Sequence, residues 1–267
     1  MAQQAILRMR DGGRLPCIVP QDEATARELG LCVHTPADVR EGLVLRLMTP
    51  RREPMDVTAR DIAGIEMDPP YALIPNFMTE VDVERAMAHA LAHEAELRDS
   101  TVAHLDHKGG YATDTRLRRS RILDNVADLA PMIGKRLYER MPDIFRALEM
   151  PPLAFRNVEM QLSVHGDGDF FNTHTDNGLP EIAHRTMTYI YYFHREPKRF
   201  TGGHLKLYRT VIHEGLHSAG DVVADIDPPR NGLVVFPSYV QHEVTPIACP
   251  SAALEDQRLT LNGWLVA

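Results

Sequence analysis

Apolar and polar positions alternate in short runs from about residue 154 to the end of the chain. Such an alternation of period two, interrupted by Gly, Pro and Asp, predicts strands joined by turns. The runs are VEMQLSV at 158–164, RTMTYIYYF at 185–193, GGHLKLY at 202–208, DVVADI at 221–226, NGLVVFP at 231–237 and RLTLNGWLV at 258–266. This many candidate antiparallel strands predicts a jelly-roll core.

Helical spacing replaces this alternation in the middle of the chain. Thr79 and Asp82 form a capping pair ahead of apolar positions that recur every three or four residues. We therefore expect a helix over roughly 80–98. A second helical region should cover about 124–148, interrupted at Pro142. Helices followed by strands indicate an α+β, mainly β fold in which helices flank the jelly roll.

The first part of the chain has a pattern of its own. Its strand-like pieces AILRMR, LPCIVP, LVLRLM and IAGIEM are broken by Gly, Pro and charged turns, with one candidate helix around 22–29. A Pro-Pro pair at 69 and 70 marks the expected boundary. We expect a small β-rich unit of unknown role over 1–68 and the main domain over 69–267.

Composition excludes several classes of protein. The 267 residues, 44% of them hydrophobic, are enough for one large domain or for a large and a small one. The chain has no apolar run near 18 residues and no signal-like start, so we expect a cytoplasmic protein with no membrane partner. Three cysteines without CxxC spacing argue against disulfides and zinc ribbons. A net charge of -8 argues against nucleic acid, and we interpret the basic cluster at 116–121 as solvated surface.

Three residues of the strand region have the types and spacing of a metal site. His174 and Asp176 are two residues apart, so an extended strand would present both to one face. His242, at the end of LVVFPSYVQH, supplies a second imidazole. Two histidines and one carboxylate form the facial triad of non-haem Fe(II) oxygenases. Arg258 begins the last strand-like run, where a buried guanidinium could bind a dicarboxylic co-substrate through two hydrogen bonds.

Other histidine motifs compete with this reading. His-x-Asp also occurs at 104–106, in a polar loop, and at 165–167, where a glycine interrupts the strand. The run 213–217, HEGLH, matches the HExxH of zinc peptidases, which needs both histidines on one face of a helix. A glycine inside it and a strand-like VI before it argue against that helix. Only the 174 pair is followed by a strand-borne histidine and by an arginine in a final strand.

Residues 71–267 resemble the 2-oxoglutarate and Fe(II)-dependent dioxygenases, within them the prolyl-hydroxylase-like group. The matching segments are IPNF, SRILD, MQLSVHGDG, HTDN, YIYYF, GGHLKLY, VVFPS and HEVTPI, and an arginine six residues before Trp264. The resemblance implies a double-stranded β-helix with His174, Asp176 and His242 as iron ligands. It also implies that Arg258 binds the distal carboxylate of 2-oxoglutarate, and Tyr191 falls where the family places a tyrosine on the same carboxylate.

Two departures from the family pattern concern the cofactor contacts. Val164 stands where hypoxia-type enzymes have a tyrosine near the iron, so that contact is either missing or supplied by another residue such as Gln161 or Asn262. The interval between the second histidine and the arginine contains an apparent insertion, PSAALEDQ, and Arg185 is the alternative anchor.

The resemblance implies a hydroxylase that uses Fe(II), 2-oxoglutarate and O2, with ascorbate as reductant. Its substrate would be a prolyl or other residue in a peptide or protein. Two alternatives stay open: hydroxylation of a free amino acid or natural-product intermediate, and a jelly-roll module that binds metal without turnover. Retention of the arginine argues against the last, because a binding module has no need of a co-substrate anchor. The sequence does not indicate an oligomeric state.

Overall fold

The computed structural model describes residues 2–20, 44–51, 53–58, 61–103, 111–150, 152–213 and 216–266. The helix expected around 22–29 lies outside these residues. The chain divides into two compact units: Met1–Pro69 with Tyr208–Val223, and Pro70–Leu207 with Ala224–Ala267. In the described part, no helix is long and apolar enough to cross a membrane.

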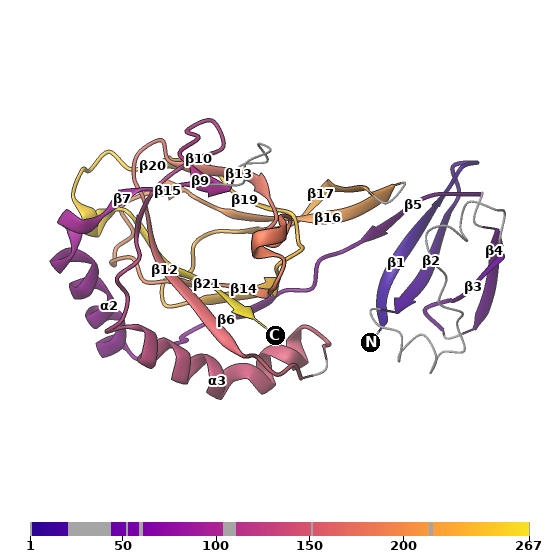
Figure 1. The fold of residues 1–267 in the computed structure, drawn as a ribbon, viewed down its shortest axis with the longest axis horizontal. Coiled ribbons are helices and arrows are strands. Elements are labelled where there is room, and N and C mark those ends of the chain that lie inside the picture. Colours follow the sequence, from indigo (N-terminus) through magenta and orange to yellow (C-terminus); the bar gives the residue numbers. More distant parts are fainter. Residues whose placement is uncertain are drawn as a thin grey trace. The chain divides into compact units, whose positions relative to one another are not determined.

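The first unit is an antiparallel β-structure with strand order β5-β1-β2-β3-β4 (Figure 1). These strands are β1 (Ala2–Met9), β2 (Arg14–Pro20), β3 (Val44–Met48), β4 (Pro54–Thr58) and β5 (Ile62–Met67). Thr210–Ile212 of β16 (Leu205–His213) also pair with β5, and β17 (Leu216–Ile226) pairs with β16. Period-two alternation buries Ala5 and Leu7 on one face of β1, where Cys17 and Val57 complete a small core.

The second unit contains a larger sheet with the order β6-β18-β14-β21-β12-β11-β7. Its strands are β6 (Ala72–Ile74), β7 (Arg98–Asp99), β11 (Arg121–Leu123), β12 (Asn157–His165), β14 (Arg185–Tyr192), β18 (Leu233–Pro237) and β21 (Arg258–Val266). Strand β21 lies between β12 and β14 and pairs antiparallel with both. The expected strands at 158–164, 185–193 and 258–266 therefore form the centre of this sheet.

A second layer of strands has the order β10-β13-β19-β16. These are β10 (Arg118–Arg119), β13 (Phe170–His174), β19 (His242–Val244) and the start of β16. Short pairs are β8 (Val102–Ala103) with β9 (Tyr111–Ala112) and β15 (Thr201–Gly202) with β20 (Ile247–Ala248). Ile190 and Tyr192 of β14 share a buried cluster with Leu205 and Leu207 of β16, so the two layers enclose an apolar core. This arrangement is the predicted jelly roll.

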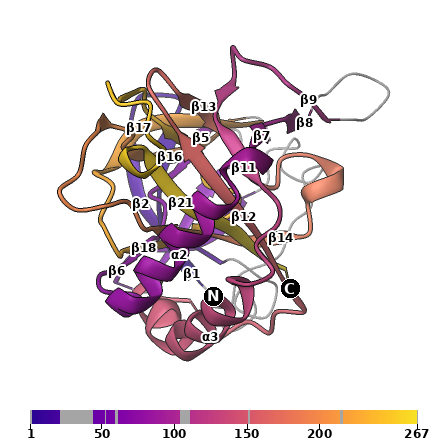
Figure 2. The ribbon, with the colours of Figure 1, turned by 90° about the vertical axis from the view of Figure 1, so that its left-hand side faces the viewer.

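Two helices cover the outer face of the larger sheet, which Figure 2 shows with α2 and α3 in front. Helix α2 (Glu80–Ala92) begins after Thr79, whose side chain accepts a hydrogen bond from the Asp82 amide as expected. It ends earlier than predicted and is followed by the 3-10 turn η3 (Glu94–Glu96). Further 3-10 turns are η4 (Pro180–Ile182) and η5 (Leu254–Asp256).

Helix α3 (Ala130–Ala147) corrects the prediction of an interrupted helix over 124–148. It continues through Pro142, which lies on the exposed side of the helix. The residue four positions earlier, Tyr138, is 83% exposed, so the hydrogen bond lost at the proline is on the solvent side of the helix, where the cost of losing it is smaller.

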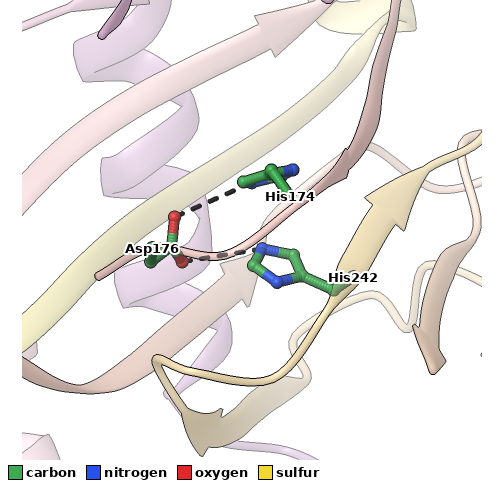
Figure 3. A group of neighbouring side chains, drawn as sticks. All are labelled: His174, Asp176 and His242. Atoms are coloured by element: carbon green, nitrogen blue, oxygen red, sulfur yellow. Dashed lines mark ion pairs between the residues drawn. The ribbon is translucent and has the colours of Figure 1, made fainter. Parts of the chain in front are cut away.

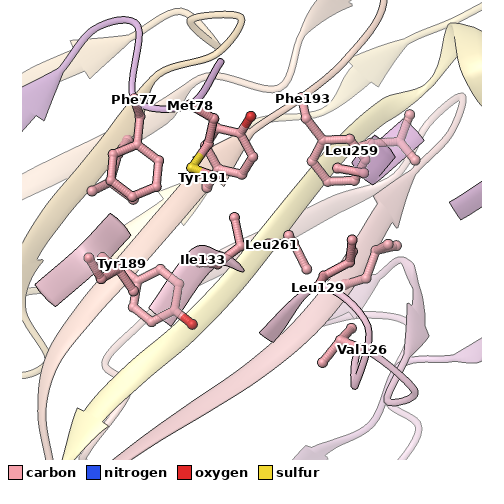
Figure 4. Packing of buried hydrophobic residues seen from close by; sticks show 14 of the residues in the cluster. Phe77, Met78, Val126, Leu129, Ile133, Tyr189, Tyr191, Phe193, Leu259 and Leu261 are labelled. Atoms are coloured by element: carbon pink, nitrogen blue, oxygen red, sulfur yellow. The ribbon is translucent and has the colours of Figure 1, made fainter. Parts of the chain in front are cut away.

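The layer between the helices and the larger sheet is the main core, shown in Figure 4. Residues of even and odd number on each strand separate cleanly: Leu259 and Leu261 of β21 face the helices, whereas Arg258 and Asn262 face the inside of the jelly roll. The odd-numbered Tyr189 and Tyr191 of β14 also lie on the helix side. This alternation determines which side chains can reach the site.

Candidate metal centre

The structure brings His174, Asp176 and His242 together inside the jelly roll (Figure 3). One ligand atom from each lies within 4.8 Å of the others. Nε2 of His174 is 3.7 Å from Oδ1 of Asp176, and Nε2 of His242 is 3.5 Å from Oδ2. Two imidazole nitrogens and one carboxylate thus converge on a point that an ion can occupy.

The local structure that produces this convergence differs from the expected one. His174 is the last residue of β13, and Asp176 lies beyond the strand end, where its amide donates to the carbonyl of Ser238. His242 does not end the strand LVVFP, which stops at Pro237. It begins β19, which belongs to the other layer from LVVFP and pairs with β13, so that His242 lies directly opposite His174. The three residues are therefore neighbours on adjacent strand ends.

Backbone carbonyls fix the orientation of both imidazoles. Nδ1 of His174 lies 2.8 Å from the carbonyl of Asn172, and Nδ1 of His242 lies 2.9 Å from that of Val240. Because a carbonyl can only accept, each ring carries its proton on Nδ1 and leaves Nε2 with a free lone pair. Burial and the neighbouring His242 lower the pKa of His174 to about 3. The ring is therefore neutral at pH 7, as a metal ligand must be.

Asp176 is held as a carboxylate. Thr188 donates a hydrogen bond of 2.7 Å to its Oδ2 and lies 3.1 Å from the hydroxyl of Ser238. Burial alone would raise the pKa of Asp176, but the two imidazoles and the Thr188 hydroxyl hold it below its usual value. A donor set of two imidazole nitrogens and one carboxylate oxygen suits Fe(II).

A cavity opens from this triad toward the deep end of the jelly roll. The side chains that line it come from β10, β12, β13, β14, β19 and β21, and from Asp176: Arg118, Gln161, His165, Phe171, His174, Asp176, Thr188, Ile190, His242, Val244, Arg258, Asn262 and Trp264. Of the residues expected to bind the co-substrate, Arg258, Gln161 and Asn262 line this cavity, whereas Tyr191 does not.

Arg258 lies in the wall of this cavity and is 1% exposed. Its Nε donates to the carbonyl of Gly203 at 2.9 Å, and its Nη1 lies 3.4 Å from Nδ1 of His165. Its Nη2 is buried and has no hydrogen-bond partner in the described part of the chain. A buried donor without a partner is costly, so this nitrogen indicates a place for an anionic ligand.

Tyr191 lies on the other side of the sheet from the cavity. Its hydroxyl donates to Oδ1 of Asn231 at 3.3 Å, and its ring packs against Phe77 at 5.5 Å (Figure 4). The next residue, Tyr192, lies on the inner side of the sheet in the apolar cluster that contains Ile190, next to the cavity wall formed by Arg258 and not in the lining itself. The guanidinium of Arg258 lies 5.1 Å from its ring centroid, and its hydroxyl is buried without a partner among the residues described. Side chains two residues apart lie on the same face of a strand, so the face that carries Thr188 and Ile190 also carries Tyr192 and not Tyr191.

The same alternation resolves the departure noted at Val164. Val164 is fully buried in the core beneath the helices, and His165 occupies the position that faces the cavity. Because Arg258 can only donate, Nδ1 of His165 must accept, which places the proton on Nε2. That Nε2 is buried and has no partner within the described residues. Burial, with the charges of Arg258 and Arg118, lowers the pKa of His165 well below its usual value.

Gln161 and Asn262 face each other across β12 and β21. Nε2 of Gln161 donates to Asp124 at 3.0 Å, and Nδ2 of Asn262 donates to the hydroxyl of Ser163 at 2.9 Å. Oδ1 of Asn262 is buried without a partner among the described side chains. Arg185, the alternative anchor, is outside the cavity, where it binds Glu159 and stacks on Trp264 at 3.5 Å.

The rival motifs do not form a second centre in the part of the chain that is described. The 104–106 motif lies outside the described residues. Asp167 accepts a hydrogen bond from the Cys249 amide and is not in the cavity. Residues 214–215 of the HExxH motif lie outside the description, and its described residues belong to strands: His213 ends β16, and Leu216 and His217 begin β17.

Arg118 corrects the interpretation of the basic cluster as solvated surface. It lines the cavity, and its guanidinium lies 4.8 Å from the ring centroid of Phe171. Four arginines on a short segment are typical of an exposed surface. The sequence alone does not show which of them points inward from the strand.

Residues 160–266 match the sequence profile of the 2OG-Fe(II) oxygenase superfamily. That segment contains every residue of the triad, as well as Arg258. This part of the chain is similar to a 2OG-Fe(II) oxygenase domain. The domain's family uses Fe(II), 2-oxoglutarate and O2, and the His-Asp-His group is its candidate iron site.

One relative is an uncharacterized PKHD-type hydroxylase of Synechocystis sp., 29% identical over 197 residues. The match covers 73% of this chain and 62% of the relative, so the oxygenase domain and its flanks span less than two thirds of that protein. A prolyl-4-hydroxylase of Pseudomonas putida has a similar structure, with a TM-score of 0.51 and 20% identity over 74% of this chain and 92% of the other. A Trichoplax adhaerens prolyl hydroxylase in complex with a peptide from hypoxia inducible factor gives 0.53 and 17%, over 74% and 83%. At these identities the structural likeness concerns the fold.

Proposed function

We propose that this protein is an Fe(II)- and 2-oxoglutarate-dependent hydroxylase of an unactivated C–H bond. The observation that carries the proposal is that one cavity joins the triad to Arg258, a buried guanidinium with an unpartnered nitrogen. A site that only bound metal would have no need of this cation. The cavity therefore supports turnover over the alternative of a non-catalytic metal-binding module.

The co-substrate fits a group of donors around Arg258. Nη2 of Arg258, Nε2 of His165 and the hydroxyl of Tyr192 are all buried and lack partners among the described residues. A carboxylate has four lone-pair positions and can accept from all of them. We assign the distal carboxylate of 2-oxoglutarate to this group, with Tyr192 in the role first expected of Tyr191. Gln161 and Asn262 remain candidates for polar contacts nearer the metal.

The chain's own residues contribute positions and charges. His174, Asp176 and His242 would hold the iron, and the hydrogen bond from Thr188 orients the Asp176 carboxylate. Bound iron, with O2 and 2-oxoglutarate, supplies the oxidant that such C–H bonds require. Ile190, Val244 and Phe171 form apolar wall around the triad and limit the entry of water.

The fold of the domain bears on the class of substrate. The names of the structural neighbours favour a prolyl or other residue in a peptide or protein. The alternative is a free amino acid or a natural-product intermediate. We do not propose a nucleic acid or a membrane as the substrate.

The test measures succinate formed from 2-oxoglutarate in the presence of Fe(II), ascorbate and candidate substrates, with iron binding followed separately. His174→Ala, Asp176→Ala and His242→Ala should each lose iron binding and succinate formation, and a chelator should abolish turnover of the native protein. His213→Ala is the matched control and should retain both. If His213→Ala is inactive and His242→Ala is active, the assignment of the centre is wrong.

A true substrate should gain one oxygen atom, labelled when the reaction is run under heavy O2. Arg258→Gln should raise the concentration of 2-oxoglutarate required for half-maximal succinate formation by roughly 10- to 150-fold, since a charge-assisted hydrogen bond is worth about 1.5–3 kcal/mol. An unchanged requirement would exclude Arg258 as the anchor.

A further inference from the structure

A second arginine faces the cavity close to the metal ligands. Arg118 lies on β10, beside β13, opposite Phe171 in the register. Its guanidinium stacks over the Phe171 ring at 4.8 Å, and that ring stacks on His174 at 3.5 Å between centroids. The positive charge of Arg118 is therefore separated from a metal ligand by the thickness of one aromatic ring.

Arg118 has neutral hydrogen-bond partners. Its Nε donates to the Ser120 hydroxyl at 2.9 Å, and its Nη2 lies 3.5 Å from the Ser163 hydroxyl. Across the described residues, no carboxylate oxygen lies within 4.0 Å of its nitrogens. Burial lowers the pKa of Arg118 to about 10. The negative charge of Asp176 opposes this shift, and the positive charge of Arg98 adds to it. Arg118 therefore stays charged at pH 7 and has no carboxylate in direct contact with it among the described residues.

The neighbouring arginines are different. Arg116 forms a salt bridge with Asp114 at 2.8 Å, and Arg119 lies 3.8 Å from Asp169. Nη2 of Arg121 donates to Gln257 at 2.9 Å. Arg118 is thus the member of this cluster that combines a position in the cavity with the lack of a carboxylate.

A charge count of the loaded site leaves one positive charge. The two positive charges of Fe(II) and the two negative charges of 2-oxoglutarate cancel. Among the residues that line the cavity, Arg118 and Arg258 are positive and Asp176 is negative, and histidines that bind a metal are neutral. One positive charge is left, and Arg118, unlike Arg258, is not assigned to the co-substrate. A half-buried guanidinium that faces a cavity without a carboxylate partner favours an anionic ligand, so the substrate is expected to bring a negative charge.

We propose that Arg118 binds a carboxylate of the substrate, so that the substrate is a small acid, such as a free or N-acylated amino acid, oxidised at a carbon near that carboxylate. This inference rests on the proposed function and deepens it. The hydroxyls of Ser120 and Ser163 hold the guanidinium toward the cavity, where its flat face rests on Phe171. Two parallel N–H groups can then meet a carboxylate, the geometry in which arginine is most selective.

The test measures binding, with Trp264 as the reporter, since it is the single tryptophan of the chain and lines the cavity. The full-length protein is loaded anaerobically with Fe(II) and 2-oxoglutarate. Free and N-acetylated L-amino acids are then titrated, each in parallel with its primary amide, while tryptophan fluorescence is recorded. We expect at least one acid to bind about tenfold or more tightly than its amide.

Variants identify the residue responsible. Arg118→Gln should remove the difference between that acid and its amide, and Arg118→Lys should retain part of it, because lysine keeps the charge without the planar fork. Arg119→Gln is the matched control on the same strand and should leave the difference intact. The affinity for 2-oxoglutarate, titrated in the same way, should change less than about threefold in Arg118→Gln.

Each alternative outcome has a distinct meaning. If every acid binds as its amide does, the inference is wrong although the proposed function stands. If Arg118→Gln weakens 2-oxoglutarate as strongly as Arg258→Gln does, Arg118 binds the co-substrate and the inference is again wrong. If the native protein with Fe(II) does not bind 2-oxoglutarate at all, the proposed function itself fails.

Discussion

Tyr192 and Tyr191 are adjacent in the chain and face opposite sides of one strand, which allows a prediction with an internal control. Tyr192→Phe removes a buried hydroxyl near Arg258 that has no partner among the described residues. We expect the dissociation constant of 2-oxoglutarate to rise about 2- to 12-fold, the value of one hydrogen bond. Tyr191→Phe should leave this constant unchanged and lower the free energy of unfolding by about 1 kcal/mol, because Asn231 loses a donor.

Titration of 2-oxoglutarate and denaturant unfolding of both variants check this prediction. If Tyr191→Phe weakens the co-substrate and Tyr192→Phe does not, the two faces of β14 have been assigned the wrong way round.

Residue types were enough to predict the triad and Arg258, because few side chains combine these chemical properties in strand-like segments. The same information could not distinguish Tyr191 from Tyr192, or Val164 from His165, since each pair differs by one position in a pattern of period two. Arg118 was missed for a related reason. Its inward direction depends on a two-residue strand and its pairing with β13, and a segment that short has no visible periodicity.

At the scale of elements, the short strand β15 carries a constraint on the co-substrate anchor. Gly203, which follows it, has φ +67, and a Cβ there would lie 2.7 Å from Cδ of Arg258 and 2.9 Å from Cγ1 of Ile247. Its carbonyl also accepts from Nε of Arg258. The Gly-Gly pair therefore lets the backbone approach and orient the arginine.

Gly203→Ala should consequently weaken the binding of 2-oxoglutarate, although Gly203 does not line the cavity. We expect a lower affinity for 2-oxoglutarate, because Arg258 must shift, and a loss of stability of about 1–3 kcal/mol from the strained φ. Gly134→Ala in α3 is the control, since a Cβ there meets nothing within 4 Å. It should leave 2-oxoglutarate binding unchanged and raise stability by about 1 kcal/mol. Equal 2-oxoglutarate titrations for Gly203→Ala and the native protein would contradict this role of Gly203.

The elements themselves were predicted unevenly. The central strands were found because their alternation is regular over eight or nine residues. The break at Pro237, after which His242 joins the opposite layer, was not found because the run stays apolar across it. Helix α3 passes through Pro142 because the helix exposes that position, which depends on tertiary packing rather than on the local sequence.

At the scale of the whole molecule, the first unit combines the start of the chain with a segment from much later in the sequence. Tyr208–Val223 belongs with Met1–Pro69, and Thr210–Ile212 pair with β5. Arg209 lies 3.9 Å from Glu66, a buried carboxylate that also accepts from Arg14 at 2.6 Å. The alternation along these residues predicts strands but does not specify their partners, so a cut at Pro69 was the simplest expectation from the sequence.

This division changes the expected result of truncation. Removal of residues 1–69 alone would leave Thr210, which is 1% exposed, and an unpaired strand edge without cover. We expect that variant to aggregate. A variant in which 208–223 is also replaced by a short Gly-Ser linker should remain monodisperse and bind Fe(II) and 2-oxoglutarate, because every residue that lines the cavity belongs to the second unit.

Size-exclusion chromatography, iron analysis and 2-oxoglutarate titration of both truncated variants distinguish the possibilities. The double deletion can differ from the native protein in its use of substrate, because the first unit contributes no residue to the cavity. A monodisperse double deletion that no longer binds iron would show that the centre depends on the first unit. A well-behaved single deletion would show instead that the strand edge at Thr210 needs no partner, and the tie between β16 and β5 would then be dispensable for folding of the second unit.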